Sequence, residues 1–284
     1  MNIKEAFNFT KLKLKEAGVE DPAFDAIYLF EYVFNMGRTD VIIHADDVVL
    51  DKDFEKLCDC IKRRENGEPH QYITQTAYFM GNTYFVKDGV LIPRDDTEVV
   101  VNACIEHLDK NECKNILDLC SGSGIIAITL KKLYPDLSVF AVEKSELAFP
   151  VLSKNCETNG AQVNAVHADL YDCVNDFSDG FFDLIVSNPP YIISDEISTL
   201  QREVQFEPKL ALDGGKDGYD FYKGIIKEYS KKLAVGGMLA FEIGEGQFDF
   251  ICDLLHKASF ENIKSYLDLG NTIRAITAIY SPET

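Results

Sequence analysis

The spacing of apolar residues changes along the 284-residue chain. Over residues 1–75 apolar side chains recur every three to four positions, which predicts amphipathic helices in a small N-terminal domain. Over residues 76–95 they fall into short β-like runs on either side of Gly81-Asn82, a turn signal. We therefore predict a helical domain followed by a β-hairpin linker.

From residue 96 to residue 284, strand-like apolar runs alternate with helix-like segments. The expected strands cover residues 115–119, 137–142, 162–167, 182–187, 238–243, 263–267 and 273–279. This alternation predicts an α/β domain built on a doubly wound, parallel, seven-stranded sheet. Such sheets bind ligands beyond the carboxyl ends of their strands, so the residues that follow each strand are candidates for function.

The first of these strand ends is rich in glycine. It leads into a loop of five residues, Cys120, Ser121, Gly122, Ser123 and Gly124, and a helix-like segment follows. Glycine lets the main chain turn sharply and approach a ligand closely, and the N–H groups at the helix start then face that ligand. The spacing fits a dinucleotide-binding fingerprint loosely, and that motif alone is weak.

Carboxylates stand at three successive strand ends. Glu143 ends the second strand, where a carboxylate can accept both ribose hydroxyls of an adenosine group. Asp118 precedes the glycines, a position suited to a cationic amino-acid group and awkward for a pyrophosphate, and Asp169 could accept from an adenine amino group. The three favour S-adenosylmethionine over a nicotinamide cofactor. Each alone could also be a helix cap or a solvated loop residue.

Another strand end carries the catalytic hypothesis. The run of β-formers over 182–187 is stopped by Asn188, Pro189, Pro190 and Tyr191, and because proline cannot donate to a sheet ladder, the chain must leave in a stiff turn. The Asn188 side chain and the Pro189 carbonyl then offer two fixed acceptors beside an aromatic ring. A planar amide or amino NH2 group needs that arrangement. The plainer interpretation is that the prolines only end a strand and Tyr191 is core.

Charge and cysteine content narrow the class of protein. The net charge of -19 makes long nucleic acid a poor candidate partner, because gripping phosphates requires an excess of Lys and Arg. Eight cysteines contain no Cys-x-x-Cys pair and no histidine at ligand spacing, so we expect reduced thiols and no metal site. The N-terminus lacks the apolar core of an export signal, and no apolar stretch approaches 18 residues, so a cytoplasmic protein is expected.

With these motifs placed, the chain resembles the release factor glutamine methyltransferases, the HemK/PrmC family of class I S-adenosylmethionine-dependent methyltransferases. The resemblance runs from about residue 67 to residue 279. The Asn-Pro-Pro-Tyr turn alone is shared with adenine methyltransferases, but its combination with other segments is far more specific. Those segments are Gly67-Glu68-Pro69-His70-Gln71-Tyr72-Ile73, Leu91-Ile92-Pro93-Arg94 with Thr97-Glu98, Glu207-Pro208 with Gly214-Gly215 and Gly218, and Phe241-Glu242-Ile243-Gly244 with Gln247.

The resemblance implies an activity, a partner and site residues. That family methylates the side-chain amide of the glutamine in the Gly-Gly-Gln motif of peptide chain release factors. A release factor is thus the expected partner, recognised by the helical domain of a monomer, without membrane or direct nucleic acid binding. The implied cofactor contacts are the loop 120–124, Glu143, Leu170 and Asn188. The implied substrate contacts are Asn188, Pro189, Pro190 and Tyr191, together with Pro93, Arg94 and Glu207.

Three alternatives stay open from the sequence. A base-flipping methyltransferase acting on an exocyclic amino group of adenine or guanine could use the same turn, although the acidic charge disfavours it. A cofactor-binding scaffold without catalysis is the second, and an intact Asn188 turn argues against it. A nicotinamide dehydrogenase is the most distant.

Overall fold

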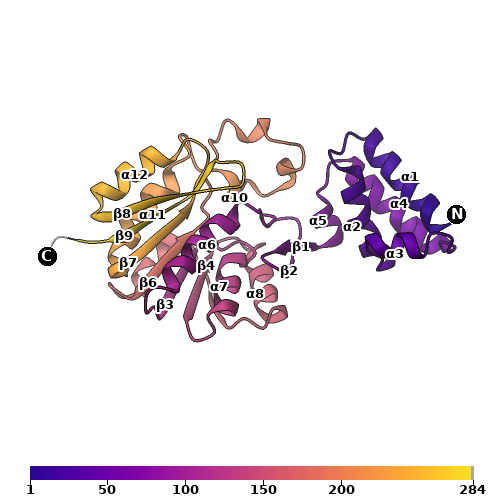
Figure 1. The fold of residues 1–284 in the computed structure, drawn as a ribbon. Coiled ribbons are helices and arrows are strands. Elements are labelled where there is room, and N and C mark those ends of the chain that lie inside the picture. The colour runs from indigo at the N-terminus through magenta and orange to yellow at the C-terminus, as the bar shows by residue number, and fades with distance from the viewer. Residues whose placement is uncertain (283–284) are drawn as a thin grey trace. The chain divides into compact units, whose positions relative to one another are not determined.

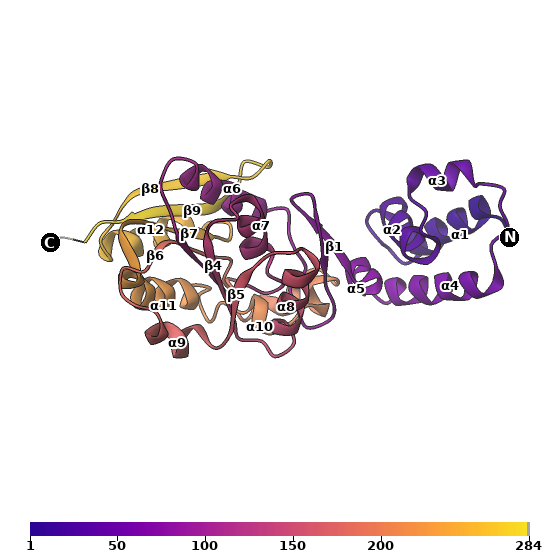
Figure 2. The same ribbon diagram turned by 90° about the horizontal axis from the view of Figure 1, so that it is seen from below.

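The computed structural model describes residues 1–282, which form two compact units, each with its own hydrophobic core (Figures 1 and 2). The first unit comprises residues 1–76 and a short segment, 201–206. The second comprises the remainder of the described chain. The chain therefore returns to the helical unit after it has already built most of the second.

The first unit is helical, as the apolar spacing predicts. Its helices are α1 (Ile3–Glu16), α2 (Pro22–Phe34), α3 (Arg38–Ile43), α4 (Asp51–Glu65) and α5 (His70–Thr74), with the short turn η3 (Val204–Phe206). Local sequence sets where helices start. The Asp21 side chain accepts the N–H of Phe24, and Pro22 occupies the first helical position, where its missing N–H costs nothing.

A buried ion cluster ties the first unit together. Arg64 of α4 donates from Nε to Asp25 of α2 over 2.5 Å, and His70 lies 3.1 Å from the other oxygen of that carboxylate. A second nitrogen of Arg64 pairs with Glu203 at 2.7 Å. Because Arg64 and Asp25 are both nearly inaccessible to solvent, each charge depends on its partners, and this pairing holds the returning segment in the unit.

The second unit contains a seven-stranded sheet in the order β5-β4-β3-β6-β7-β9-β8. Its strands are β3 (Asn115–Leu119), β4 (Ser138–Glu143), β5 (Val163–His167), β6 (Phe182–Ser187), β7 (Leu233–Glu242), β8 (Phe260–Leu267) and β9 (Ile273–Tyr280). Its helices and helical turns are α6 (Thr97–Leu108), α7 (Ile125–Leu133), α8 (Phe149–Thr158), α9 (Leu170–Cys173), η1 (Val174–Asp176), η2 (Ile197–Thr199), α10 (Lys209–Leu212), α11 (Asp220–Tyr229), η4 (Ser230–Lys232) and α12 (Phe248–Lys257). The predicted fold class, a doubly wound α/β domain on a seven-stranded sheet with a helical N-terminal unit, is confirmed.

Both faces of the sheet are covered by helices (Figure 1). Along β6, Leu184 and Val186 pack in the cluster with α6, α7 and α8, while Ile185 packs in the opposite cluster with α11 and α12. Since successive side chains of a strand point to opposite faces, burial on both faces requires the continuous apolar run that the sequence shows. Because the interior of β6 is buried on both faces, only the ends of this strand can reach a ligand.

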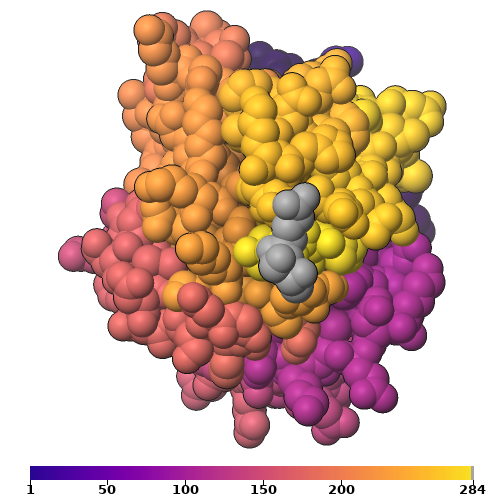
Figure 3. Space-filling model, turned by 90° about the vertical axis from the view of Figure 1, so that its left-hand side faces the viewer, coloured from indigo at the N-terminus to yellow at the C-terminus, as the bar shows by residue number. Residues whose placement is uncertain are grey.

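The sheet is not wholly parallel, which differs from the prediction. Strands β3 to β7 pair in parallel, but β9 runs antiparallel to both β7 and β8. The physical reason is the short connection between β8 and β9, because a parallel pair needs a crossover of a dozen residues or more. In the space-filling view of Figure 3, the gold and yellow surface to which these closing strands and α12 belong borders the orange segments and the magenta segments.

The β-hairpin predicted over residues 76–95 packs on the second unit. Strands β1 (Thr76–Phe79) and β2 (Asn82–Phe85) pair as a two-stranded sheet. Phe79 and Tyr84 are buried in the same core as α6 and α7, and the Tyr84 hydroxyl lies 3.0 Å from that of Thr129. The hairpin is therefore an integral part of the second unit. Its alternating pattern predicted the strands but not what their buried face would meet.

Candidate active site

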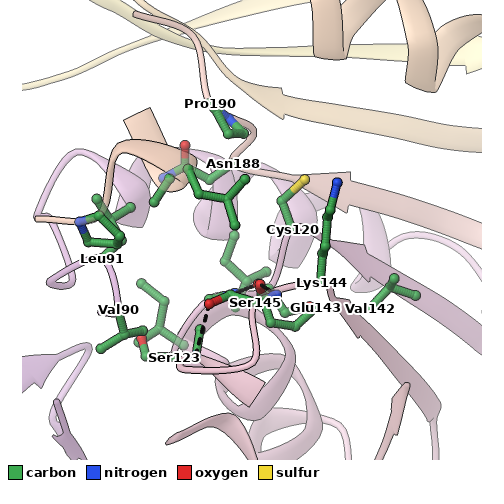
Figure 4. Close-up of a pocket in the computed structure, with 18 of the residues that line it drawn as sticks. Val90, Leu91, Cys120, Ser123, Val142, Glu143, Lys144, Ser145, Asn188 and Pro190 are labelled. Carbon is green, nitrogen blue, oxygen red and sulfur yellow. Dashed lines mark hydrogen bonds between the residues drawn. The ribbon is translucent and has the colours of Figure 1, made fainter. Parts of the chain in front are cut away.

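The second unit contains a pocket beyond the carboxyl ends of β3, β4, β5 and β6 (Figure 4). Its empty volume is about 1070 Å³ with the open space at its mouth included, which is room for a nucleoside-sized ligand. The predicted site residues that line it are Pro93, Arg94, Cys120, Ser121, Gly122, Ser123, Glu143, Asp169, Leu170, Asn188 and Pro190. Those that lie elsewhere in the described chain are Asp118, Gly124, Pro189, Tyr191 and Glu207.

The loop after β3 is shaped by left-handed backbone. Gly122 and Gly124 have φ values of 55° and 86°. A Cβ at Gly124 would stand 2.3 Å from Leu152, so this glycine allows α7 to pack closely on α8, whereas a Cβ at Gly122 would meet nothing within 4 Å. The two glycines therefore serve different purposes. Gly124 permits internal packing, and Gly122 leaves the loop open to a ligand.

Cys120 stands beside the glycines in the pocket wall (Figure 4). Its φ of 59° is unusual for a residue with a side chain and places backbone strain at the site. Burial, with Glu143 nearby, raises the pKa of its thiol far above the ordinary value. The thiol is therefore protonated at neutral pH, which is the wrong state for a nucleophile.

Glu143 connects the loop to the end of β4. Its two carboxylate oxygens accept the N–H of Gly122 at 2.7 Å and that of Ser145 at 2.6 Å. The side chain is 8% exposed, so these bonds orient it firmly. A carboxylate oxygen has more than one acceptor position, and each oxygen of Glu143 can still receive a hydroxyl of a ligand.

The structure corrects the role expected for Asp118. Its carboxylate is completely buried beneath the loop, where Oδ2 accepts the N–H of Ala127 at 3.2 Å and Oδ1 has no partner in the described chain. Burial raises its pKa to about 8. The side chain bonds to α7 and does not line the pocket, so the expected direct contact with a cationic ligand group is not part of this geometry.

Asp169 lies at the pocket but has protein partners. It caps α9 by accepting the N–H of Tyr171 at 3.0 Å, and its other oxygen pairs with Lys144 at 2.6 Å. Although burial acts in the opposite direction, these two partners hold the pKa of Asp169 below its ordinary value. The carboxylate is thus charged, and Lys144 is a pocket residue that sequence reasoning missed.

The turn after β6 is connected to α6 and β7 by its side chains. Asn188 donates from Nδ2 to the Thr97 hydroxyl at 3.2 Å, and this hydroxyl donates to Glu242 at 2.6 Å. The Tyr191 hydroxyl donates to the other Glu242 oxygen at 3.3 Å. Tyr191 packs against the core of the sheet and does not line the pocket, so the expected stacking of its ring on a target amide is not part of this geometry.

The main chain of the same turn is tethered from behind. Gln247 donates from Nε2 to the Tyr191 carbonyl at 3.1 Å and to the Gly218 carbonyl at 3.3 Å. A Cβ at Gly214 would stand 2.7 Å from the Tyr191 Cα and 2.9 Å from the Pro190 carbonyl. The family segments around these positions therefore have a structural purpose, which is to build the support beneath the turn.

Arg94 and Glu207 form a second support. They are ion-paired, and Glu207 also accepts the N–H of Ile92 at 3.0 Å. Glu207 is 6% exposed, and its burial raises its pKa. Arg94 and Pro93 line the pocket, whereas Glu207 does not, so Glu207 positions this wall and has no direct access to a ligand.

Sequence reasoning assigned no site role to Thr97, Glu242 or Gln247. Their distances along the chain from the turn, 91 positions for Thr97 and 56 for Gln247, exceed anything that periodicity can connect. The available signal was chemical. A glutamate within the apolar end of β7 and a glutamine shortly after it are polar groups in a buried setting, and such groups require hydrogen-bond partners.

The sequence and the fold match known proteins. A model of the methyltransferase small domain matches residues 94–206, and a model of the PrmC N-terminal domain matches residues 5–74. The structure of the hMettl16 catalytic domain in complex with the MAT2A 3'UTR hairpin 6 is 15% identical with a TM-score of 0.54, covering 84% of this chain and 87% of that chain, and it supports the fold alone. The protein is a methyltransferase.

Its relatives define the family more narrowly. A release factor glutamine methyltransferase of Clostridium acetobutylicum is 34% identical over 98% of this chain and 99% of its own length. Those of Clostridium botulinum and Geobacter sulfurreducens are 36% and 35% identical over 93% and 91% of this chain, and 94% and 89% of their own lengths. The chain belongs to the release factor glutamine methyltransferase family. The resemblance seen in the sequence is confirmed.

Proposed function

We propose that this enzyme transfers a methyl group from S-adenosylmethionine to the side-chain amide nitrogen of the glutamine in the Gly-Gly-Gln motif of peptide chain release factors. One observation carries the proposal. Residues 120–123 of the glycine loop, Glu143, and Asn188 and Pro190 of the turn, which follow three different strands, line one pocket. The family membership of the chain supports the choice of substrate.

The residues of the pocket fit this cofactor. Glu143 retains acceptor capacity for ribose hydroxyls, and the open space at Gly122 allows a ligand to approach the loop closely. Leu170 and Tyr171 offer apolar and aromatic surface beside Asp169 for an adenine ring. When bound, the cofactor supplies an electrophilic methyl group on a sulfonium.

Among the described helices none is both long and apolar enough to cross a membrane.

The protein's part in the reaction is to orient a weak nucleophile. An amide nitrogen has its lone pair delocalised into the carbonyl, so it reacts only when it is held in line. The Asn188 side-chain oxygen accepts one N–H of the target amide, and the main-chain carbonyl of Pro189 accepts the other. Pro189 stands in the chain between Asn188 and Pro190, which both line the pocket. Positioning of this kind can supply much of a rate enhancement.

The same acceptors stabilise the transition state. Positive charge develops on the nitrogen as its new bond forms, and the two oxygens that accept its hydrogens are already aimed at it. An N-alkylated amide cation is strongly acidic and loses its proton without a dedicated base. The raised pKa of the neighbouring Tyr191, caused first by burial, fits a residue that takes no part in proton transfer at neutral pH.

We propose that the helical unit recognises the release factor. Several large apolar side chains of this unit are exposed, which is a feature of interaction surfaces. They are Ile42 at 72%, Ile43 at 69%, Val48 at 77% and Leu50 at 66% exposure.

The test is Asn188→Ala, with methylation of a release factor followed by mass spectrometry of its Gly-Gly-Gln peptide. Loss of one preorganised group predicts at least a hundredfold lower rate, equivalent to roughly 3 kcal/mol. Cofactor affinity should fall by a smaller factor, because the glycine loop and Glu143 still line the pocket. A release factor with alanine in place of the target glutamine is the matched control and should take up no methyl group. Near-normal turnover by the variant, or methyl transfer to nucleic acid and not to the release factor, would refute the proposal.

A further inference from the structure

Thr97, which lines the pocket, and Glu242, which does not, form a buried pair beside the catalytic turn. Thr97 begins α6 and Glu242 ends β7, and each is 1% exposed. The Thr97 hydroxyl donates to Glu242 Oε2 at 2.6 Å, a short bond of the kind expected with a charged acceptor. The same hydroxyl is the partner of the Asn188 carboxamide at 3.2 Å.

Thr97 has a single hydroxyl hydrogen, and the direction in which it points determines which end of the Asn188 carboxamide faces Thr97. Ionised Glu242 is an acceptor only, so the hydroxyl hydrogen of Thr97 must point toward it. The Thr97 oxygen then has only lone pairs left for Asn188. The carboxamide must therefore present its NH2 group to Thr97, which turns its oxygen away from Thr97. If the hydroxyl hydrogen pointed at Asn188, the opposite orientation would be favoured.

We propose that Thr97 and Glu242 are positioning residues that determine which end of the Asn188 carboxamide faces the target amide. The inference rests on the proposed function, because the oxygen end can accept an N–H of glutamine whereas the NH2 end would oppose it. Neither residue needs to touch the reacting atoms. They act through the single hydrogen bond from Asn188 to Thr97.

Protonation of Glu242 would remove the constraint. Burial raises its pKa to about 7, against the hydrogen bonds from the Thr97 and Tyr191 hydroxyls. The charged groups that face it are Arg274 of β9, which lowers this pKa, and Asp96, which raises it and is itself paired with Arg274 at 3.1 Å.

The Tyr222 hydroxyl of α11 donates to the main-chain carbonyl of Glu242 at 3.0 Å. A protonated Glu242 could donate to Thr97 and free the Thr97 hydroxyl hydrogen for the Asn188 oxygen. Activity should therefore fall as the pH is lowered through the pKa of Glu242.

The first test compares substitutions of threonine. Thr97→Val keeps the shape and removes the hydroxyl, and kcat for the release factor should fall at least tenfold, with the affinity for the cofactor unchanged. Thr97→Ser keeps the hydroxyl and should recover most of the rate. The matched control is Thr129→Val, which removes a buried hydroxyl 3.0 Å from that of Tyr84, outside the pocket, and should leave kcat unchanged. Wild-type kcat in Thr97→Val would overturn the inference.

The second test uses Glu242→Gln, which cannot titrate and can offer either an oxygen or an NH2 group to Thr97. Between pH 6 and 8 the kcat of the wild type should rise with pH, whereas that of the variant should be lower and nearly flat. If both profiles rise alike, Glu242 does not control the turn. Tyr191→Phe, which removes only the other hydroxyl bonded to Glu242, should keep the rising profile.

A third measurement needs no methyl transfer. The side-chain NH2 of Asn188, assigned by its loss in Asn188→Ala, should exchange slowly with solvent in the wild type and rapidly in Thr97→Val. Equal exchange in both proteins would contradict the inference. If the wild type fails to methylate any release factor, the proposed function fails, while this exchange measurement still decides how the carboxamide is held.

Discussion

Gln247 provides a demanding test of how the catalytic turn is supported. Its side-chain oxygen accepts the N–H of Gly244 at 2.9 Å and shares the Tyr222 hydroxyl hydrogen, at 3.2 Å, with the Glu242 carbonyl, while its nitrogen donates to the carbonyls of Tyr191 and Gly218. All four hydrogen-bonding positions of the amide are used, and the residue is 8% exposed. Gln247→Leu keeps a similar size and removes all four bonds.

The cost follows from the groups left behind. Tyr222 keeps a second partner, the carbonyl of Glu242 at 3.0 Å, but the main-chain groups of Gly244 and Gly218 each lose a buried bond to the side chain, and Tyr191 loses a partly buried one. An unsatisfied buried group costs about 1 to 3 kcal/mol, so the lower bound from the two buried groups is about 2 kcal/mol. For a unit of this size, each kcal/mol lowers the midpoint of thermal unfolding by about 2 to 4 °C, which predicts a fall of at least roughly 4 °C.

Differential scanning calorimetry of the ligand-free protein measures this directly. The transition of the second unit should move to lower temperature, while that of the helical unit should stay in place because Gln247 belongs to the second unit. Gln162→Leu is the matched control, since Gln162 is exposed and its loss should change stability by no more than about 0.5 kcal/mol. The methylation rate of Gln247→Leu should also fall, because the Tyr191 carbonyl is released.

A loss of less than about 1 kcal/mol in Gln247→Leu would refute the reasoning. It would mean that the three main-chain groups find other partners at no cost and that the amide is not what anchors the turn. A large loss of stability with an unchanged methylation rate would be equally informative. The support would then be needed for folding but not for the position of the turn.

Two further predictions concern the buried carboxyl of Asp118 and the contact between Gly214 and the catalytic turn. The folded-state pKa of Asp118 is about 8, above its ordinary value of 3.8, so the native state binds this proton more tightly than the unfolded state and its contribution to stability is lost as pH rises from about 4 to 8. Asp118→Asn should therefore gain stability relative to the wild type between pH 5 and 8 in urea denaturation, by up to about 1.4 kcal/mol per unit of pH, and a constant difference would contradict this. Gly214→Ala should lower kcat at least tenfold, because the new Cβ would stand 2.7 Å from the Tyr191 backbone. Gly37→Ala, whose Cβ meets only side-chain atoms at 3.5 Å or more, should not change kcat, and equal activity of the two variants would argue against a fixed turn.

The predicted positions of strands and turns held where the residues of one short segment are enough to form the element. The strands β3, β4 and β6 lie where the apolar runs placed them, and the left-handed glycines after β3 occur where the sequence turns. The direction in which the last strands of the sheet pair was not predicted correctly. The antiparallel β9 depends on the length of a connection, a property of two strands together, and a single run of apolar residues does not contain it.

The candidate site divides along the same line. The sequence by itself determined that the glycine loop, Glu143 and the Asn188 turn meet at one sheet edge, because parallel strands bring their carboxyl ends together. Only the tertiary structure decided that Asp118 lies under the loop and that Thr97 bonds to Glu242, a residue 145 positions away. Periodicity states which side of an element is buried, whereas hydrogen-bond partners depend on the packing of distant elements to within a fraction of an ångström.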